Sequence, residues 1–302
     1  MEQGEQMMSD PPDMRSTLRL SDGEEIGYDV YLPGPFPEPL PIPLPITIVA
    51  HGFKGFKEWG FFPYAGRALA DAGMAVIVMN FSHNGLDPHG EEFTRPERFA
   101  TNTFTREIRE LREMIDAVEA DRLGLGERVD RTSIATVGHS RGGGIVLLEA
   151  ANDPRLRGVV TWSAVSTFDR YSRRQIEMWR REGQLEVINA RTGQVLQLDK
   201  CLLEDLERNS EKLDIRQAVK TLDRPLLIVH GEVDLTVPPS NAVDLHSAAS
   251  NSQSELVRVP RTGHTFGAVH PFAGPTEALR TVIDTTVAFL QSRVFRPPPY
   301  AA

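Results

Sequence analysis

Apolar residues along the chain form two kinds of pattern that alternate with each other. The first kind is a short run with little polar interruption, which is typical of a strand buried on both faces of a parallel sheet. Such runs occupy residues 46–50, 74–81, 134–137, 158–163, 225–229 and 256–259. The second kind has helical periodicity and occupies residues 61–73, 103–123, 145–149, 238–249 and 276–294. This alternation predicts an α/β domain with a mostly parallel, doubly wound sheet and flanking helices.

The residues before position 46 depart from this alternation. Residues 1–14 are acidic and polar, which predicts a disordered tail ahead of a domain that covers residues 15–302. Residues 17–20 and 26–32 are predicted strands joined by a turn. Residues 33–45 carry proline at nearly every second position, so we expect an extended surface connection and no central strand. A proline-rich ligand for a partner protein is the alternative interpretation.

The alternation also stops at about residues 164–222. Residues 168–181 have the pattern of an amphipathic helix that carries aromatic side chains. Two short apolar runs, 185–188 and 195–198, flank a polar turn and predict a β-hairpin, and one or two helices are expected over residues 202–218. We interpret this region as a small inserted lid over a site, with a packed structural appendage as the alternative.

The composition excludes several classes of function. The 302 residues are 40% hydrophobic and 25% charged, which is enough for one large α/β domain. The net charge is −9 and no basic run is present, so no nucleic-acid partner is expected. No apolar stretch has the length of a membrane span, and the N-terminus has no signal-peptide core. The single cysteine excludes an intrachain disulfide, and we expect a cytoplasmic protein. A homodimer is compatible with the sequence.

The stretch around residue 140 carries the strongest chemical signal. Residues 133–149 place a Gly-His-Ser-Arg-Gly turn between a predicted strand and a predicted helix, with Ser140 between Gly138 and Gly142. This arrangement is typical of a nucleophile elbow, in which small neighbours let the chain bend and let a substrate approach. Backbone N–H groups at the helix start have no helical partner and point to where an oxyanion would form. The alternative is a glycine-rich turn with an exposed serine.

A histidine–glycine pair at the end of the first central strand predicts the other half of an oxyanion hole. Its donor would be the backbone N–H of Phe53, and the second donor would be that of Arg141. We expect His51 to be structural. Phe53 and Phe56 either line an acyl pocket or pack in the core, and the sequence leaves both interpretations open. The candidate lining of the substrate pocket comprises Phe56, Trp162, Tyr171 and Trp179.

An acid and a base follow later strands. Asp234 and His264 each lie just past the carboxyl end of a predicted strand, as Ser140 does. In an open parallel sheet these ends line one crevice, so the three side chains are expected to meet there as a Ser-His-Asp triad. Glu232 and Asp244 are rival acids, but the first lies too close to its strand and the second lies within the next helix.

The chain resembles the α/β-hydrolase superfamily over nearly its whole length, and it is nearest to the branch of dienelactone-hydrolase-like and cinnamoyl- or feruloyl-esterase-like enzymes. The resemblance rests on HGF at 51–53, GHSRGG at 138–143, HGEVDLTVP at 230–238 and TGH at 262–264. It implies the α/β-hydrolase fold with a small lid, the triad above, and the Phe53 and Arg141 amides as oxyanion hole. The chain departs from the family in having serine where dienelactone hydrolases have cysteine, and in the sequence NFSHNG at 80–85.

Together these features predict a serine esterase that acts on a small-molecule ester, with aryl or cinnamoyl esters favoured by the aromatic lid. Two histidines between residues 82 and 102 match no metal-ligand spacing, so no metal or cofactor is expected. An acyl thioesterase or a small peptidase on the same triad is the alternative, and a non-catalytic binding protein is the third class. A thioesterase for coenzyme A would need a basic patch, and the sequence has none except the lid residues Arg170, Arg173, Arg174, Arg180 and Arg181, for which a solvated helix face is the alternative.

Overall fold

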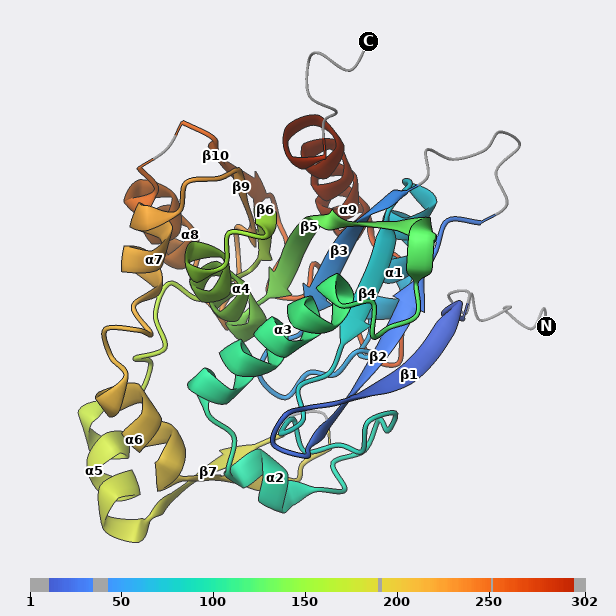
Figure 1. The fold of residues 1–302 in the computed structure, drawn as a ribbon. Helices are drawn as coiled ribbons and strands as arrows, with labels where there is room; N and C mark the ends of the chain where they lie inside the picture. The colour runs from blue at the N-terminus through green and yellow to red at the C-terminus, as the bar shows by residue number, and fades with distance from the viewer. Residues whose placement is uncertain (1–10, 35–42, 190–191, 251, 296–302) are drawn as a thin grey trace, which may run out of the picture.

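A central sheet of eight strands organises the protein, in the order β1-β2-β4-β3-β5-β6-β9-β10 (Figure 1). The structure is a computed structural model, and it describes residues 11–34, 43–189, 192–250 and 252–295. The strands are β1 Met14–Arg19, β2 Glu25–Tyr31, β3 Leu44–Ala50, β4 Ala75–Met79, β5 Val129–His139, β6 Leu156–Trp162, β9 Leu226–Gly231 and β10 Ser254–Val259. All pairs from β4 to β10 in this order are parallel, whereas β1 and β2 pair antiparallel. The predicted mostly parallel sheet is confirmed.

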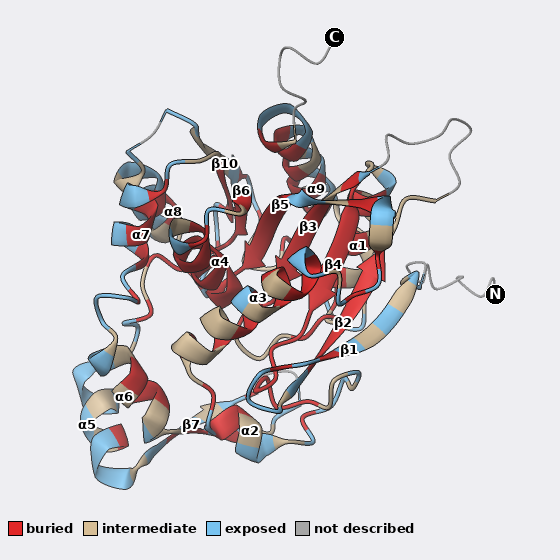
Figure 2. Ribbon diagram, viewed as in Figure 1, coloured by how far each residue is buried: buried red, intermediate tan, exposed pale blue. Residues whose placement is uncertain are grey.

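Helices cover both faces of the sheet, so the central strands are buried on each side (Figure 2). One core contains residues of α3 Phe104–Glu119, α4 Arg141–Asn152, α7 Ile215–Thr221 and α8 Ser240–Ala248. The other contains residues of α1 Phe62–Asp71, α9 Glu277–Phe289 and the following π-helical turn Leu290–Val294. A 3₁₀ turn, Gly126–Arg128, leads into β5. None of the described helices is long and apolar enough to cross a membrane.

The inserted region forms a small unit beside the short helix α2 Pro96–Ala100, at the lower left of Figure 1. It contains α5 Arg173–Glu182, β7 Gln184–Ile188, β8 Val195–Asp199 and α6 Lys200–Arg208. The predicted hairpin is confirmed, because β7 and β8 pair antiparallel. Ser172 starts α5 with a capping box in which its hydroxyl and the Gln175 side chain each accept a backbone N–H. Lys54 Nζ donates to the carbonyl of Ile188 (2.9 Å), which joins the hairpin to the loop after β3.

Two predicted boundaries differ from the structure. The expected tail lies outside the described residues as far as residue 10, but Met14 already pairs with Val30 in β1. The prediction that no central strand includes residues 33–45 is wrong at its end, because β3 begins at Leu44 and contains Pro45. The β3–β5 ladder shifts register between Leu44 and Ile46, so the N–H that proline lacks is not needed there. Residues 35–42 lie outside the described part of the chain.

A buried ion network fastens the loop after β3 to the antiparallel edge of the sheet. Lys57 and Asp29 have no exposed side-chain surface, and Lys57 Nζ lies 2.9 Å from Asp29 Oδ2. Lys57 also pairs with Glu58, and Arg15 pairs with the other oxygen of Asp29 (2.8 Å). The Lys57 backbone N–H donates to Asn80 Oδ1 (2.7 Å). The loop that carries Phe53 is therefore held at its far end by charges that water does not reach.

We predict that Lys57→Met lowers the free energy of unfolding by about 3 kcal/mol, because it leaves the buried Asp29 carboxylate with only a partly exposed partner, Arg15. The double variant Asp29→Asn/Lys57→Met should lose less than the single variant, since no unpaired charge remains. Urea unfolding measures both. Lys212→Met is the control, because Lys212 is exposed and forms no ion pair with a described carboxylate. A single variant as stable as this control would contradict the prediction.

Candidate active site

Ser140 occupies a strained turn between β5 and α4. Its backbone angles are φ 58° and ψ −118°, in a region that non-glycine residues rarely adopt. Three backbone hydrogen bonds hold it there: its N–H donates to Trp162 O (2.9 Å), and its carbonyl accepts from the N–H groups of Gly143 (3.1 Å) and Val165 (3.3 Å). The serine is 6% exposed. The predicted elbow thus has the geometry that presents a serine hydroxyl at a strand end.

Glycines let the turn pack against the end of β3. A Cβ atom on Gly142 would lie 2.3 Å from His51 O, and one on Gly138 would lie 2.4 Å from Gly142 O. A Cβ atom on Gly52 would lie 2.7 Å from Ser140 Cβ and 3.3 Å from its Oγ. No side chain fits at these distances, so the loop after β3 runs directly beside the serine.

This close approach brings two unused backbone donors to the serine. Phe53 follows Gly52, and Arg141 follows Ser140 as the first residue of α4. In the described part of the chain, neither backbone N–H donates a hydrogen bond. Donors of this kind beside a nucleophile suit a developing oxyanion. His51 fixes the loop, since its Nδ1–H donates to Gly52 O (2.9 Å) and its Nε2 accepts from Phe81 N–H (3.2 Å), which confirms its structural role.

Asp234 and His264 form a close pair on the loops after β9 and β10. His264 Nδ1 lies 2.7 Å from Asp234 Oδ2, and Asp234 Oδ1 accepts the N–H groups of Thr236 (2.8 Å) and Val237 (2.9 Å). Burial alone would raise the pKa of Asp234, but hydrogen bonds from His230 and His264 outweigh it and lower that pKa below its usual range. Asp234 is therefore a buried carboxylate that stays charged and orients the His264 ring.

Two further histidines support this pair, and the sequence analysis assigned neither a role. His230 is fully buried, its Nε2–H donates to Val237 O (2.8 Å), and the same nitrogen lies 3.4 Å from Asp234 Oδ2. His139 Nε2–H donates to the backbone carbonyl of His264 (3.0 Å), and the two rings lie 4.7 Å apart. Burial, aided by the charge of His264, lowers the pKa of His139 to about 3, so His139 remains a neutral support.

Ser140 and His264 are linked through His139 and not by a hydrogen bond of their own. His139 precedes Ser140 in the chain and holds the His264 carbonyl. Among the hydrogen bonds of the described residues, none joins Ser140 Oγ to His264. Such catalytic hydrogen bonds are often long before a substrate is bound.

The side chain of Arg141 forms a buried ion pair beside the serine. Its Nη1 lies 3.2 Å from Glu107 Oε1 on α3, and both side chains are less than a tenth exposed. The guanidinium lies 4.3 Å from the centre of the Phe53 ring and 4.8 Å from that of Phe104. Burial raises the pKa of Glu107, and the charge of Arg141 and a hydrogen bond from Asn102 oppose the rise. This ion pair is not evident from the sequence, because Glu107 lies 34 residues before Arg141.

The four candidate pocket residues lie in different surroundings. Phe56, Trp162 and Trp179 have no exposed surface. Phe56 packs edge-on against His270, and Trp162 Nε1 donates to the hydroxyl of Thr286 on α9 (3.0 Å), so both belong to the core. Trp179 packs within the insertion against Tyr171, at 5.1 Å between ring centres. Only Tyr171 keeps part of its surface accessible.

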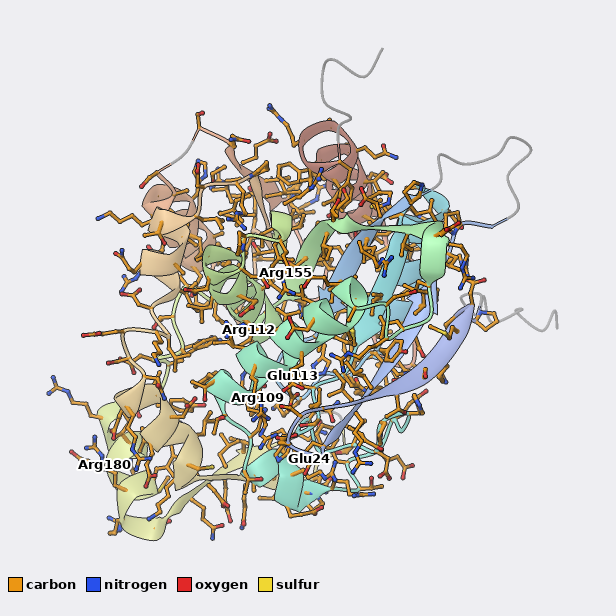
Figure 3. The ribbon with its side chains drawn as sticks, in the orientation of Figure 1. Glu24, Arg109, Arg112, Glu113, Arg155 and Arg180 are labelled. Atoms are coloured by element: carbon orange, nitrogen blue, oxygen red, sulfur yellow. The ribbon has the colours of Figure 1, made fainter. Side chains whose placement is uncertain are left out.

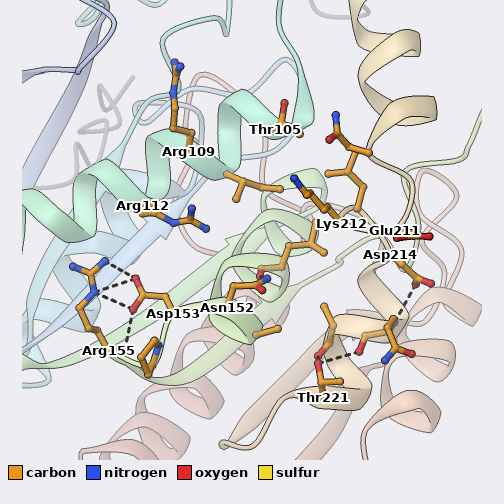
Figure 4. A pocket seen from close by; sticks show the side chains of 18 of the residues that line it. Thr105, Arg109, Arg112, Asn152, Asp153, Arg155, Glu211, Lys212, Asp214 and Thr221 are labelled. Atoms are coloured by element: carbon orange, nitrogen blue, oxygen red, sulfur yellow. Dashed lines mark hydrogen bonds and ion pairs between the residues drawn. The ribbon is translucent and has the colours of Figure 1, made fainter.

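A wide groove of about 1150 Å³ lies elsewhere, between α3, the end of α4 and α7 (Figure 4). None of Ser140, Asp234 and His264 lines it. Its charged side chains are largely engaged with one another or with neighbours, as Arg155 is with Asp153 (Figure 4). Among its described lining residues, it offers no nucleophile beside a base.

The loop histidines do not converge on a metal site. His83 contacts the hydroxyl of Ser82 (2.7 Å), and His89 contacts that of Thr17 (3.0 Å). Within the described ranges, no group of three or more His, Cys, Asp or Glu side chains is placed to hold a metal ion.

Known structures share this architecture. The esterase domain of a Rhodothermus marinus protein superposes with a TM-score of 0.60 at 22% identity, over 93% of this chain and 98% of that one. Est1E from Butyrivibrio proteoclasticus with ferulic acid bound gives 0.65 at 21%, over 94% and 100%. A dienelactone hydrolase from Anabaena variabilis gives 0.58 at 16%, over 93% and 98%. A search of curated protein sequences returned no match. These likenesses show the fold, which is the predicted α/β-hydrolase fold.

The sequence itself matches a family over most of its length. Residues 59–293, more than three quarters of the chain, match the prolyl oligopeptidase family. The match includes the serine turn, the acid loop and the histidine loop. The chain is therefore a serine hydrolase of the α/β-hydrolase superfamily, and it belongs to the prolyl oligopeptidase family.

Proposed function

We propose that this protein is a serine esterase in which Ser140 is the nucleophile, His264 the general base and Asp234 the carboxylate that orients it. One observation carries the proposal. The strained Ser140 turn packs against Gly52, so that two free backbone donors flank the hydroxyl, and the His264–Asp234 pair lies on the neighbouring loops. A nucleophile, a base and an oxyanion site are the three parts that acyl transfer needs.

The first half of the reaction forms an acyl-enzyme. His264 takes the Ser140 proton while Oγ attacks the ester carbonyl carbon. The Phe53 and Arg141 amides bind the resulting oxyanion, and each donor is worth about 3 kcal/mol in the transition state. Asp234 stabilises the imidazolium that forms, because its charge persists in the buried site.

The second half returns the enzyme to its starting state. The intermediate collapses, and His264 gives its proton to the departing alcohol. A water molecule then attacks the acyl carbon with His264 again acting as base, and the acid leaves while Ser140 recovers its proton. None of these steps needs a cofactor.

Two observations bear on the substrate. The insertion presents Tyr171 near Arg141, and Est1E, which shares the fold, was solved with ferulic acid bound, so aryl or cinnamoyl esters are the first substrates to test. The second candidate function is peptide hydrolysis, and the family match favours it. The same groups would cleave an amide, with His264 protonating the departing amine.

We predict that Ser140→Ala lowers kcat for p-nitrophenyl esters by roughly 10⁴-fold or more, because the acyl-enzyme cannot form. The assay compares p-nitrophenyl acetate to decanoate and a feruloyl ester with peptide p-nitroanilides. Ser247→Ala on α8 is the control, since that serine is exposed and lies away from the triad. A Ser140→Ala variant that keeps its activity would refute the mechanism, and turnover of the anilides alone would make the protein a peptidase.

We also predict a single ionisation on the acid side of the pH profile of kcat/KM. A general base must be unprotonated to accept the Ser140 proton, so a single ionisation lowers activity by at most tenfold per pH unit as pH falls. Asp234 adds no second ionisation between about pH 4 and 6, because its lowered pKa keeps it charged there. A slope of two in this range would show that Asp234 titrates with the base. Asp234→Asn should lower kcat by about 10⁴-fold.

A further inference from the structure

Two arginines from different parts of the chain lie on segments that run beside Ser140, since Arg141 follows it and the Val165 N–H ahead of Arg170 donates to the Ser140 carbonyl. Arg141 begins α4, and Arg170 lies at the start of the insertion, just ahead of α5. The Arg141 guanidinium lies 4.8 Å from the centre of the Phe104 ring, and that ring stacks at 4.0 Å on Phe168, two residues before Arg170. Partial burial lowers the pKa of Arg170, and the charge of Arg141 acts in the same direction. Burial raises the pKa of the Tyr171 hydroxyl, and the charges of Arg141 and Arg170 oppose the rise.

Only one of these two positive charges has a carboxylate committed to it. Glu107 neutralises Arg141 through the contact at 3.2 Å. Arg170 Nη2 donates to the backbone carbonyl of Thr236 (2.6 Å), which orients the guanidinium but carries no charge. Arg170 makes no ion pair with any carboxylate in the described part of the chain. Asp234 is within electrostatic range, but both of its oxygens are already occupied.

Several other arginines are neutralised by carboxylates, whereas Arg170 contacts a backbone carbonyl. Arg112 binds Glu149 through two contacts of 2.8 Å, Arg155 pairs with Asp116 at 2.7 Å, and Arg180 pairs with an acid on α6. Figure 3 labels these three arginines. The whole chain carries a net charge of −9. Arg170 is distinguished by its position, because Thr236 accepts from Arg170 through its carbonyl and donates to Asp234 through its N–H.

Two like charges at close range repel each other, and an anion between them removes that cost. Arginine N–H groups and a tyrosine hydroxyl are the donors that bind a carboxylate well, since charge-assisted hydrogen bonds are the strong ones. Arg141 is adjacent to Ser140 and contacts the Phe53 ring at the oxyanion loop, so an anion held here lies within one substrate length of the reacting carbonyl.

We propose that the preferred substrate is an ester that carries a carboxylate group of its own, which Arg170, Arg141 and the Tyr171 hydroxyl bind. This inference rests on the proposed esterase function and adds the charge of the substrate to it. The carboxylate supplies the negative charge that the pair of arginines lacks.

The test compares two esters of matched shape, p-nitrophenyl hydrogen glutarate and neutral p-nitrophenyl pentanoate. Wild type should show a kcat/KM about tenfold higher for the charged ester, and Arg170→Met should reduce this ratio about tenfold. Arg170→Lys should retain part of it. Arg170 is exposed, so these variants do not disturb the core. Arg173→Met, an exposed arginine of α5, is the matched control and should leave both esters unchanged.

The ratio separates recognition from a structural role. If Arg170 only braced the Thr236 loop, Arg170→Met would slow both esters alike and the ratio would stay constant, which overturns the inference. A wild-type ratio at or below one overturns it as well. Added salt should lower the ratio, because screening weakens the contact.

Binding of free glutarate, followed by calorimetry, gives a readout without turnover. Glutarate should bind wild type and Arg173→Met and should bind Arg170→Met at least tenfold more weakly. If the protein hydrolyses neither ester but binds glutarate in this way, the esterase proposal fails while the anion site stands. If it hydrolyses the neutral ester and does not bind glutarate, the anion site fails while the esterase proposal stands.

Discussion

The close packing of two backbone segments is the constraint on which the site depends. The turn at Ser140 and the loop after β3 approach so closely that Gly52 and Gly142 have no room for a Cβ atom, and Gly138 has none within the turn itself. At this contact Ser140 has φ 58°, and Phe53, whose amide makes no hydrogen bond within the described residues, follows Gly52 in the chain. The strained conformation costs on the order of 1–3 kcal/mol and persists only because the surroundings determine it. The main chain thus sets the geometry of the proposed oxyanion site, and the central sheet holds the two segments in place.

Holding that contact requires both sides of it to be rigid. On the serine side, three backbone hydrogen bonds and the α4 helix fix the turn. On the other side, His51 ties the start of the loop to Phe81, and Lys57 ties its end to the buried Asp29. Burying charges costs several kcal/mol per ion unless each is paired, so this anchor is effective only when complete. The antiparallel edge strands, which carry no catalytic side chain, therefore contribute to the geometry of the oxyanion loop.

Sequence patterns predicted the parallel sheet and the grouping of chemistry at strand ends, because continuous apolar runs mark buried strands and their carboxyl ends share one edge. Asp234 and His264 were found in this way, and they meet at 2.7 Å. The support of Asp234 by His230, and the pairing of Arg141 with Glu107, were not foreseen. Both contacts depend on the direction in which a side chain points. The hydrophobic pattern of a buried strand or helix does not reveal that direction. The short helix α2 was missed for a related reason, since five residues are too few to show a period.

The same limits explain why the charge of the site was not visible in the sequence. Composition reports a net charge of −9, and the lid arginines form no continuous basic run. In the fold, Arg180 and Arg181 pair with carboxylates on the surface, whereas Arg170 donates to a carbonyl of the loop that follows Asp234. Local potential in a cleft depends on which charges remain uncompensated there and not on the total. An acidic protein can therefore present a local cationic site, as proposed for Arg141 and Arg170.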